Sequence, residues 1–192
     1  MERKNFDLVV IGAGPGGYVA AIRAAQNGKS VALIEKGDMG GTCLNVGCIP
    51  TKTLIASALM VNKVKLAKEF GIETGPVSFD YSKMKERKDN VAGSIRKSLT
   101  GLIQSNGITI LKGKAEFTSL NELKVVGEEG HLIHFEKAII ATGSIPLDIP
   151  AFPCDHKKIF NSSSILEVTT LPKKIAIRSE EHTSELQSPD HL

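Results

Sequence analysis

The amino-acid sequence predicts an α/β fold in which helices join the strands of a parallel sheet and a small antiparallel β-meander is added. The prediction rests on short apolar runs typical of buried strands, on helical stretches between them, and on a glycine-rich turn directly after the first run. A length of 192 residues allows one full domain and part of another. The net charge of +3, without any basic tract, argues against nucleic acid as a partner.

The first part of the chain carries a strand, a glycine turn and a helix in succession. A strand is expected over Phe6–Ile11, and the turn Gly12–Gly17 (GAGPGG) follows it at once. An alanine-rich helix is expected from about Tyr18 to Gln26, and a second strand, Val31–Ile34, leads into Glu35. Strand, glycines, helix, strand and acid in this order are typical of a Rossmann-like dinucleotide-binding unit.

Each part of this unit has a physical role. Gly12 allows the tight turn, Gly14 lets the backbone approach a pyrophosphate, and Gly17 lets the helix pack close to the strand. The helix N-terminus offers N–H donors to phosphates, and Glu35 is placed to accept hydrogen bonds from ribose hydroxyls. A carboxylate there repels the 2′-phosphate of NADP. FAD and NAD satisfy the same physics, and a glycine turn that binds nothing is the structural alternative.

Two cysteines follow in the segment Gly40–Lys52 (GGTCLNVGCIPTK). Pro50 and the helical periodicity after it place Cys48 at or just before a helix N-terminus, where unpaired N–H groups and the helix dipole favour a thiolate. Cys43 and Cys48 can close a small, labile disulfide ring of the catalytic kind. Two unpaired buried cysteines are the alternative. A metal site is disfavoured because the only other cysteine is Cys154 and no histidine is near.

Beyond the cysteines the sequence predicts further helices and strands. The helix after the cysteines runs to about Phe70, and a scaffold helix without chemistry spans Tyr81 to Asn106, with Asp80 as its expected N-cap. Within it, Lys83–Lys88 is interpreted as a solvated charged face. The apolar stripe of this scaffold helix is Met84, Val91, Ile95, Leu99, Leu102 and Ile103. The later strands are expected at Ile108–Leu111, Glu116–Thr118, Leu123–Val126, His131–Phe135 and Lys137–Ala141, the middle three forming the meander. Both histidines of the meander, His131 and His134, are expected to be solvated.

The sequence divides into three segments. Residues 1–150 are expected to form the dinucleotide-binding domain with the redox cysteines, and residues 151–177 a connector that ends in a strand-like run, Pro172–Ile177. From residue 178 to 192 the sequence is polar and has neither a helical nor a strand period. It is also the string that a common sequencing adapter encodes in one reading frame. We therefore expect residues 178–192 to be a non-native, disordered tail, with a genuine disordered tail as the alternative.

The glycine turn, the cysteine segment and the Ala-Thr-Gly-Ser turn at residues 141–144 together resemble those of the flavoprotein disulfide reductases. The cysteine segment is most similar to the dihydrolipoyl dehydrogenase type. Glutathione and mercuric reductases usually carry Val at the positions of Leu44 and Ile49. The resemblance covers about Asn5 to Ile177. It implies an FAD-dependent disulfide oxidoreductase that oxidises dihydrolipoamide to lipoamide with NAD as final acceptor, as in the E3 component of 2-oxo acid dehydrogenase complexes.

The resemblance also implies roles for individual residues. Cys43 and Cys48 would form the redox disulfide, with Cys48 in charge-transfer contact with the flavin and Cys43 exchanging with the dithiol substrate. Lys52 would lie near the flavin N5 edge. The residues implied to bind FAD are Gly12, Gly14, Pro15, Gly16, Gly17, Glu35, Lys36, Gly41, Thr42, Lys52, Gly113, Ala115, Ala141, Thr142, Gly143 and Ser144.

Complete members of this family continue from the strand matching Pro172–Ile177 into a second glycine fingerprint for NAD and then a dimerisation domain with a His–Glu pair. The sequence after Ile177 matches neither, so the fragment itself is expected to be inactive. The alternatives are a stand-alone FAD-binding module, another disulfide reductase of the glutathione or mercuric type, and an NAD-binding protein with incidental cysteines. The implied partners of the parent enzyme are a lipoyl domain of an acyltransferase or carrier protein and a second subunit.

Location is also predicted from the sequence. The first residues lead straight into a strand, which leaves no room for a signal peptide, and three cysteines without an export signal indicate the cytoplasm. No apolar run is expected to reach the length of about 18 residues that a membrane span needs, so no membrane partner is expected.

Overall fold

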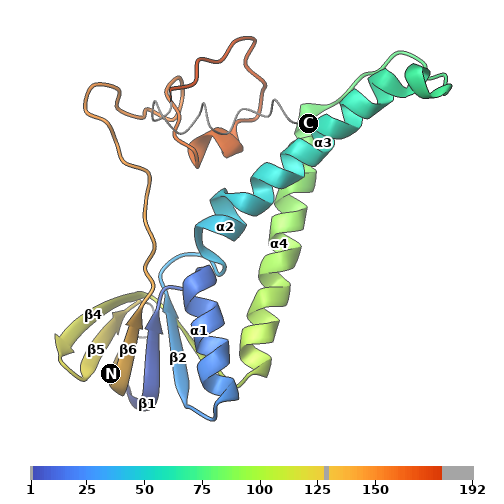
Figure 1. Ribbon diagram of the computed structural model, residues 1–192. Helices are drawn as coiled ribbons and strands as arrows, with labels where there is room; N and C mark the ends of the chain where they lie inside the picture. The colour runs from blue at the N-terminus through green and yellow to red at the C-terminus, as the bar shows by residue number, and fades with distance from the viewer. Residues whose placement is uncertain (1, 128–129, 179–192) are drawn as a thin grey trace.

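The computed structural model describes residues 2–127 and 130–178. Of the tail expected from residue 178 onward, all but Arg178 lies outside the described residues. Figure 1 shows a sheet with helices on one face, a pair of long helices that extends away from it, and an irregular segment that leaves the last strand. These parts agree with the α/β fold that the sequence predicts.

The strands form one six-stranded sheet with the order β3-β2-β1-β6-β5-β4. β1 pairs in parallel with β2 and β6, and β2 in parallel with β3, whereas β4, β5 and β6 pair antiparallel. The strands are β1 (Glu2–Ile11), β2 (Val31–Glu35), β3 (Thr109–Lys112), β4 (Lys114–Ser119), β5 (Glu122–Val126) and β6 (His131–Ile140). The parallel part and the meander are therefore two regions of one sheet.

β6 corrects the prediction of two separate strands at its position. The strand is continuous because it has a neighbour on each side: Ile133 pairs with Leu123 of β5 and with Lys4 of β1, and further along Ile139 pairs with Val10. Pairing on both sides in its first half leaves no turn between the meander and the parallel region. The same pairing extends β1 at its polar start, beyond the apolar run that the sequence marks.

His131 is another correction. The sequence predicts solvated histidines in β6, but His131 is buried at 8% exposure, whereas His134 is exposed. Successive strand residues point to opposite faces, so odd-numbered residues of β6 near its start share the covered face with Ile133 and Phe135.

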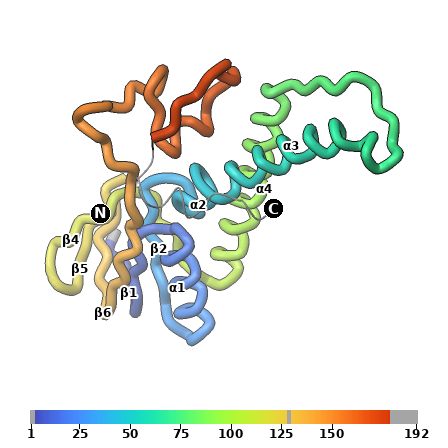
Figure 2. The backbone as a smooth tube through the Cα atoms, turned by 45° about the horizontal axis from the view of Figure 1, so that its top comes forward, coloured from blue at the N-terminus to red at the C-terminus, as the bar shows by residue number. Residues whose placement is uncertain are grey.

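The helices occupy one face of the parallel strands and the space beyond it (Figures 1 and 2). α1 and the lower part of α4 lie against the sheet, and α3 runs beside the upper part of α4. The helical segments are α1 (Pro15–Gln26), α2 (Gly41–Val46), α3 (Cys48–Leu66), η1 (Ala67–Phe70), α4 (Tyr81–Ser105) and η2 (Ser164–Glu167). Asp80 caps α4 by accepting the N–H of Ser82, as the sequence predicts, and its pKa is lowered by hydrogen bonds from the Ser82 side chain and backbone.

Two apolar clusters bury both faces of the parallel strands. On the helix side, Val10 and Leu33 pack with Ile103 and Ile108, and these side chains are at most 4% exposed. On the other face, Val9 belongs to a cluster with meander residues such as Leu123, Ile133 and Phe135. Burial on both faces explains why the strands read as continuous apolar runs.

The outer helices are less covered than their periodicity predicts. On α3 only Pro50 and Thr53 are buried, and Ile55 is 50% exposed. On α4 the predicted stripe members Ile95 and Leu102 are 40% and 51% exposed. A helical period indicates which residues share a face, but it does not state how much of that face another element covers.

The helical stretch Gly41–Phe70 is long and apolar enough to cross a membrane, judged by length and composition only. This overturns the expectation that no apolar run reaches that length. The stretch is weak evidence for a membrane, because core helices of globular proteins pass the same test. In this structure 17% of the most apolar part of the stretch is buried.

Among the described residues after β6, 141–178, the chain is irregular apart from η2 and an isolated bridge between Ile149 and Phe152. The strand expected over Pro172–Ile177 does not form, and Ile175 and Ile177 are 59% and 88% exposed. A strand needs a neighbour for its backbone hydrogen bonds. Within the described residues none lies beside this run.

A charged cluster holds this segment to α4. Lys88 Nζ donates to the Leu166 carbonyl at 2.9 Å and lies 2.8 Å from Glu167 and 2.9 Å from Asp89. Lys85 completes the cluster, at 2.8 Å from Asp89 and 3.1 Å from Glu167. Lys88 is 1% exposed, so the interpretation of this stretch as a wholly solvated face is wrong. Its four-carbon stem spans the packed surface while its ammonium reaches two carboxylates.

Candidate active site

The residues predicted to bind a dinucleotide meet at one edge of the sheet, where the parallel strands end. The N–H of Gly12 donates to the Ile34 carbonyl at 2.8 Å, and the N–H of Ala141 donates to the Ile11 carbonyl at 2.8 Å. The turns after β1 and β6 are thus joined to neighbouring strand ends. The chain leaves β1 toward β2 on one side, whereas β6 lies on the other. Open α/β sheets bind ligands at such a reversal of strand order.

Close backbone approach explains the glycines of the first turn. A Cβ on Gly12 would lie 2.2 Å from the Ala141 oxygen, and Gly12 has a φ of +102°. A Cβ on Gly17 would lie 1.7 Å from the Gly12 oxygen. A Cβ on Gly41 would lie 2.6 Å from the Cα of Gly14. The turn after β1, the start of α1 and the start of α2 therefore touch through their backbones, and only glycine fits these three positions.

The N-terminus of α1 at this edge has the character of an anion site. Gly14 is its N-cap and supplies no side-chain cap, Pro15 occupies the first turn, and the first turn holds no acidic residue. Unpaired N–H groups and the positive end of the helix dipole remain available there. Gly16 has open space where a Cβ would point. These features fit a phosphate group.

Glu35, at the end of β2, joins the glycine turn to the following loop. Its Oε2 accepts the N–H of Ala13 at 2.7 Å, and its Oε1 accepts the N–H of Gly37 at 2.7 Å. A carboxylate has about four acceptor positions, so capacity for hydroxyl donors remains. The next strand end joins this edge through Gly113, whose N–H donates to the Glu35 carbonyl at 2.9 Å, and the Lys112 ammonium donates to the Gly37 carbonyl.

The two cysteines lie at the junction of α2 and α3, and Gly47 makes that junction possible. Cys43 belongs to α2, and Cys48 is the first residue of α3. A Cβ on Gly47 would lie 2.8 Å from the Thr42 oxygen and 3.3 Å from the Cα of Cys43. The chain therefore folds back on itself between the cysteines. Both are free thiols; Cys43 is half-buried and Cys48 is exposed.

The contact between the thiols changes the acidity of one of them. A hydrogen bond with the Cys48 side chain, followed by burial and the neighbouring sulfur, raises the pKa of Cys43. The backbone N–H of Cys48 and the positive charge of Lys52 act in the opposite direction without reversing the shift. Cys43 therefore holds its proton more strongly than an ordinary thiol, and Lys52 is the cation that acts on it.

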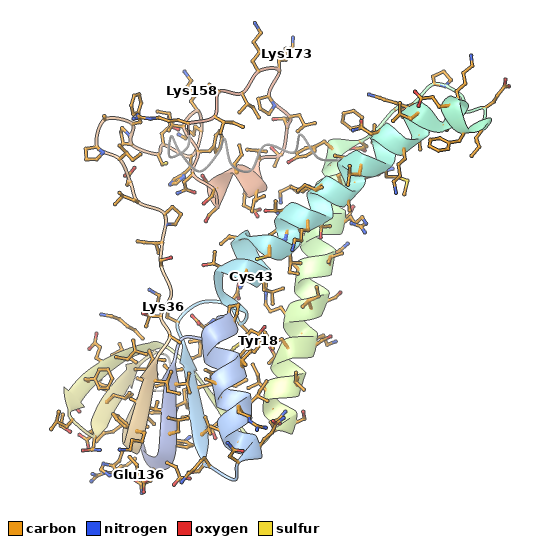
Figure 3. The ribbon with its side chains drawn as sticks, viewed as in Figure 1. Tyr18, Lys36, Cys43, Glu136, Lys158 and Lys173 are labelled. Atoms are coloured by element: carbon orange, nitrogen blue, oxygen red, sulfur yellow. The ribbon has the colours of Figure 1, made fainter. Side chains whose placement is uncertain are left out.

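Some of the other residues predicted to bind FAD lie at this edge of the sheet, and others lie away from it. Figure 3 shows Lys36 at the end of the sheet from which the last segment departs, and Cys43 in α2 beyond the end of α1 that carries Tyr18. Thr142 lies at the same edge, since a Cβ on Gly12 would come within 3.2 Å of its Cα. Ala115 is different: it pairs with Val125 in the sheet and packs against the buried cluster.

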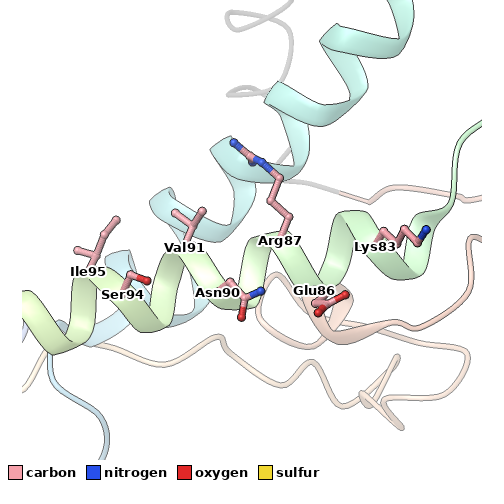
Figure 4. A pocket seen from close by; sticks show the side chains of 7 residues that line it. All are labelled: Lys83, Glu86, Arg87, Asn90, Val91, Ser94 and Ile95. Atoms are coloured by element: carbon pink, nitrogen blue, oxygen red, sulfur yellow. The ribbon is translucent and has the colours of Figure 1, made fainter.

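Ser144 and Gly143 are exposed at the start of the irregular segment, Thr42 is exposed in the first turn of α2, and Lys52 is exposed on α3. Two concavities elsewhere on the described part of the chain contain none of the predicted residues. One of about 470 Å³ follows a face of α4 from Lys83 to Ile95 (Figure 4), and one of about 750 Å³ lies between α3, the 74–80 segment and α4. No residue of the strand edge lines either one.

Two polar residues that the sequence does not single out also belong to the site. Asn45, between the cysteines, donates its amide to the Met39 carbonyl of the loop before α2 and to the Gly41 carbonyl in the first turn of α2, and Arg96 of α4 donates to Asn45. The only sequence signal for Asn45 is its place between the cysteines. Arg96 gives none, because a charged residue on a long helix is ordinarily solvated.

A family model described as pyridine nucleotide-disulphide oxidoreductase matches residues 6–178. The chain belongs to this family. The matched region includes the glycine turn, both cysteines and the strand edge, and it ends where the polar tail begins.

Individual members of the family are also similar to the chain. It is 50% identical to the dihydrolipoyl dehydrogenase of Chlamydia pneumoniae over 174 residues, which cover 91% of this chain and 38% of that protein. It is 43% identical to the dihydrolipoyl dehydrogenase of Bacillus subtilis over 173 residues, covering 88% and 38% respectively. The chain thus spans less than two fifths of these relatives.

A solved structure gives the same result for the fold. The chain is similar to the HOCl-induced flavoprotein disulfide reductase RclA of Escherichia coli in a Cu(II) complex, with a TM-score of 0.70 and 30% identity. The match covers 88% of this chain and 36% of that one. The Rossmann-like architecture predicted from the sequence is confirmed.

Proposed function

We propose that this chain is the flavin and dithiol part of a dihydrolipoyl dehydrogenase, which oxidises dihydrolipoamide to lipoamide and passes the electrons to NAD. The observation that carries the proposal is the contact between the thiols of Cys43 and Cys48, which Gly47 allows, at a helix N-terminus in a disulphide oxidoreductase chain. The relatives with this name and with identities of 43% to 50% support the choice of substrate.

FAD fits the residues of the strand edge. The close approaches at Gly12, Gly17 and Gly41 leave the start of α1 without side chains, and its N-terminus has no cap of its own. Glu35 has acceptor positions left for ribose hydroxyls, and its charge disfavours a 2′-phosphate. Lys36, Thr42, Gly113 and residues 141–144 complete the proposed binding set, with Pro15, Gly16, Lys52 and Ala115. When bound, FAD supplies the two-electron acceptor that oxidation of a dithiol requires.

The cysteines exchange electrons with substrate by thiol–disulfide chemistry. In the oxidised pair, a thiolate of dihydrolipoamide attacks Sγ of Cys43, and Cys48 leaves as a thiolate. The second thiol of the substrate then attacks the sulfur bound to Cys43. This releases lipoamide with its ring disulfide and leaves two reduced cysteines. Cys43 is half-buried and Cys48 is exposed at the first position of α3, so the Cys48 sulfur is free to leave toward solvent.

In the parent enzyme, the NAD site and the contacts with a second subunit would be formed by residues outside the present chain. We propose a homodimer in the cytoplasm, with a lipoyl domain of an acyltransferase or carrier protein as the substrate donor, and neither nucleic acid nor membrane as partner. Residues 1–150 would form the FAD-binding domain, residues 151–177 the connector, and residues 178–192 a non-native tail. We expect no NAD-linked turnover from residues 1–192.

Substrate exchange in the isolated chain tests the proposal. The purified chain is oxidised, separated from oxidant and treated with dihydrolipoamide or with glutathione, and thiols at Cys43 and Cys48 are counted by alkylation and mass spectrometry. We expect dihydrolipoamide to reduce the pair and FAD to bind, with loss of FAD binding in Gly12→Ala. Reduction by glutathione but not dihydrolipoamide would favour a glutathione reductase instead. Failure to bind FAD with an intact pair would remove the flavin part of the proposal.

A further inference from the structure

Asn45 lies between the two cysteines, and its side chain ties α2 to the loop that precedes it. Nδ2 of Asn45 donates to the Gly41 carbonyl at 2.9 Å and to the Met39 carbonyl at 3.1 Å, with the Asp38 carbonyl more distant at 3.4 Å. A side-chain amide has two N–H donors, so both are used by the start of α2 and the loop before it. The part of the chain that carries Cys43 is thereby closed into a compact turn.

Arg96 sets the orientation of that amide from the middle of α4. Its Nε donates to Oδ1 of Asn45 at 3.0 Å, and its Nη1 lies 3.5 Å from a carboxylate oxygen of Asp38. Arginine has donors only, so it requires the oxygen of Asn45 to face α4 and the NH2 group to face the loop carbonyls. The reversed amide would place NH2 against the guanidinium and an oxygen against carbonyls.

The segment that these residues hold has little stability of its own. α2 has six residues and no side-chain cap, and helices of that length do not persist without tertiary contacts. Its one buried side chain is Leu44, at 5% exposure. The link from Arg96 through Asn45 is a second, polar anchor, and it attaches α2 to a helix of 25 residues.

We propose that Arg96 and Asn45 are positioning residues for the Cys43–Cys48 pair, which hold α2 so that the two sulfurs remain in contact. The inference rests on the proposed function, because it requires the pair to interconvert between dithiol and disulfide. Both residues act through the backbone of residues 38–45. Fixing two reacting groups at contact raises their effective concentration, so the link favours disulfide formation.

The charge of Arg96 is not what acts on the thiol. The cation that influences the pKa of Cys43 is Lys52. Removal of Arg96 should therefore weaken disulfide formation and also move the pH profile of Cys43 alkylation to lower pH, because it loosens the contact with Cys48 that raises the pKa of Cys43. Lys52→Met should move that profile to higher pH instead, because the lysine charge opposes the upward shift. These two readouts separate positioning from electrostatics.

The test is a redox titration of the full chain in glutathione buffers. Two thiols of the pair and one glutathione disulfide convert to one intramolecular disulfide and two glutathione molecules, and the fraction oxidised is measured by acid trapping and mass spectrometry. We expect Arg96→Ala to lower the equilibrium constant for disulfide formation about tenfold, equivalent to about 1.4 kcal/mol. That is the size of one hydrogen bond to a charged group. The reaction requires no flavin.

Two substitutions separate the hydrogen bond from the charge. Arg96→Gln places an amide nitrogen at the chain position of the arginine Nε, so it keeps the donor to Asn45 and loses the charge. Arg96→Lys keeps the charge and has no donor at that position. We expect the Gln variant to stay near the wild-type constant and the Lys variant to match the Ala variant. Lys97→Ala, an exposed neighbour on the same helix, is the matched control and should change nothing.

Each outcome decides between specific alternatives. A wild-type constant in Arg96→Ala, with or without a lower melting temperature, would make Arg96 purely structural and overturn the inference while the proposed function stands. Rescue by Lys and not by Gln would overturn it in favour of charge. Absence of a Cys43–Cys48 disulfide in the wild-type chain would instead refute the proposed function, and this inference with it.

Discussion

Replacement of Lys88 by Met tests how the segment after β6 is held to the rest of the molecule. The Lys88 side chain is 2% exposed, whereas the side chains of Asp89 and Glu167 that meet it are 48% and 54% exposed. Met keeps most of the buried stem and removes the ammonium, and with it the bond to the Leu166 carbonyl. The perturbation is thus confined to one charged group and its three contacts.

The magnitude follows from what each partner does after the substitution. A hydrogen bond to a charged group contributes about 1.5–3 kcal/mol net. The two carboxylates become hydrated again because they are half exposed, so they are not left as stranded buried charges, and desolvation of an ammonium is no longer required. We therefore expect a net loss of about 2 kcal/mol, below the about 3–5 kcal/mol of a broken, fully buried pair.

The loss should appear first as local opening of the segment that contains η2. Trypsin sites at Lys157, Lys158, Lys173 and Lys174 lie in this segment. If cleavage follows the opened population, 2 kcal/mol corresponds to about thirtyfold faster proteolysis. Lys97→Met, an exposed lysine on the same helix, is the control. Equal cleavage rates for Lys88→Met and Lys97→Met would refute the reasoning that the cluster anchors this segment.

Three further predictions concern the site and the cluster. Gly12→Ala should abolish FAD binding in a fluorescence titration and destabilise the chain by at least about 2 kcal/mol in urea, because its Cβ would lie 2.2 Å from a backbone oxygen at a φ of +102°. Lys52→Met should raise the pKa of Cys43 further, since the lysine charge opposes the existing upward shift, and this would appear as a shift of the alkylation profile to higher pH. Burial alone would raise the pKa of Asp89 and of Glu167, but hydrogen bonds from Lys85 and Lys88 lower the pKa of both carboxyls. The two carboxylates should therefore stabilise the fold by a constant amount at neutral pH, and this stabilisation should be lost as acid protonates them below about pH 4. Urea unfolding curves at several pH values would show the loss.

The sequence predicts the elements that local chemistry determines. The glycine turn, the helix after it and the N-cap at Asp80 follow from backbone conformations and hydrogen bonds that a few neighbouring residues supply, although the helix begins at Pro15 and the sequence predicts it only from about Tyr18. The order of strand, turn, helix and strand also predicts that Gly12 and Glu35 meet at one edge, because parallel strands end together. The structure confirms that meeting, through the bond from Ala13 to Glu35.

What the sequence does not predict depends on contacts between distant segments. Lys88 has the pattern of a solvated helix residue, and its burial requires Glu167, which is 79 positions away. β6 is one strand because β1 and β5 both pair with it, and no period within residues 131–140 contains that information. Conversely, Pro172–Ile177 has the pattern of a strand and forms none, because pattern alone does not provide a pairing partner.

α4 combines these long-range contacts in one element. Its Ile103 packs into the apolar cluster beside the parallel strands, its Arg96 holds the loop that carries Cys43 through Asn45, and its Lys88 holds the segment that departs from the strand edge. The helix therefore connects the sheet, the redox cysteines and the connector. The sequence predicts a scaffold role only for this helix, yet it contributes to the geometry of the site. It does so through polar side chains, Arg96 and Lys88, whose partners lie far away in the sequence and cannot be identified from the helix alone.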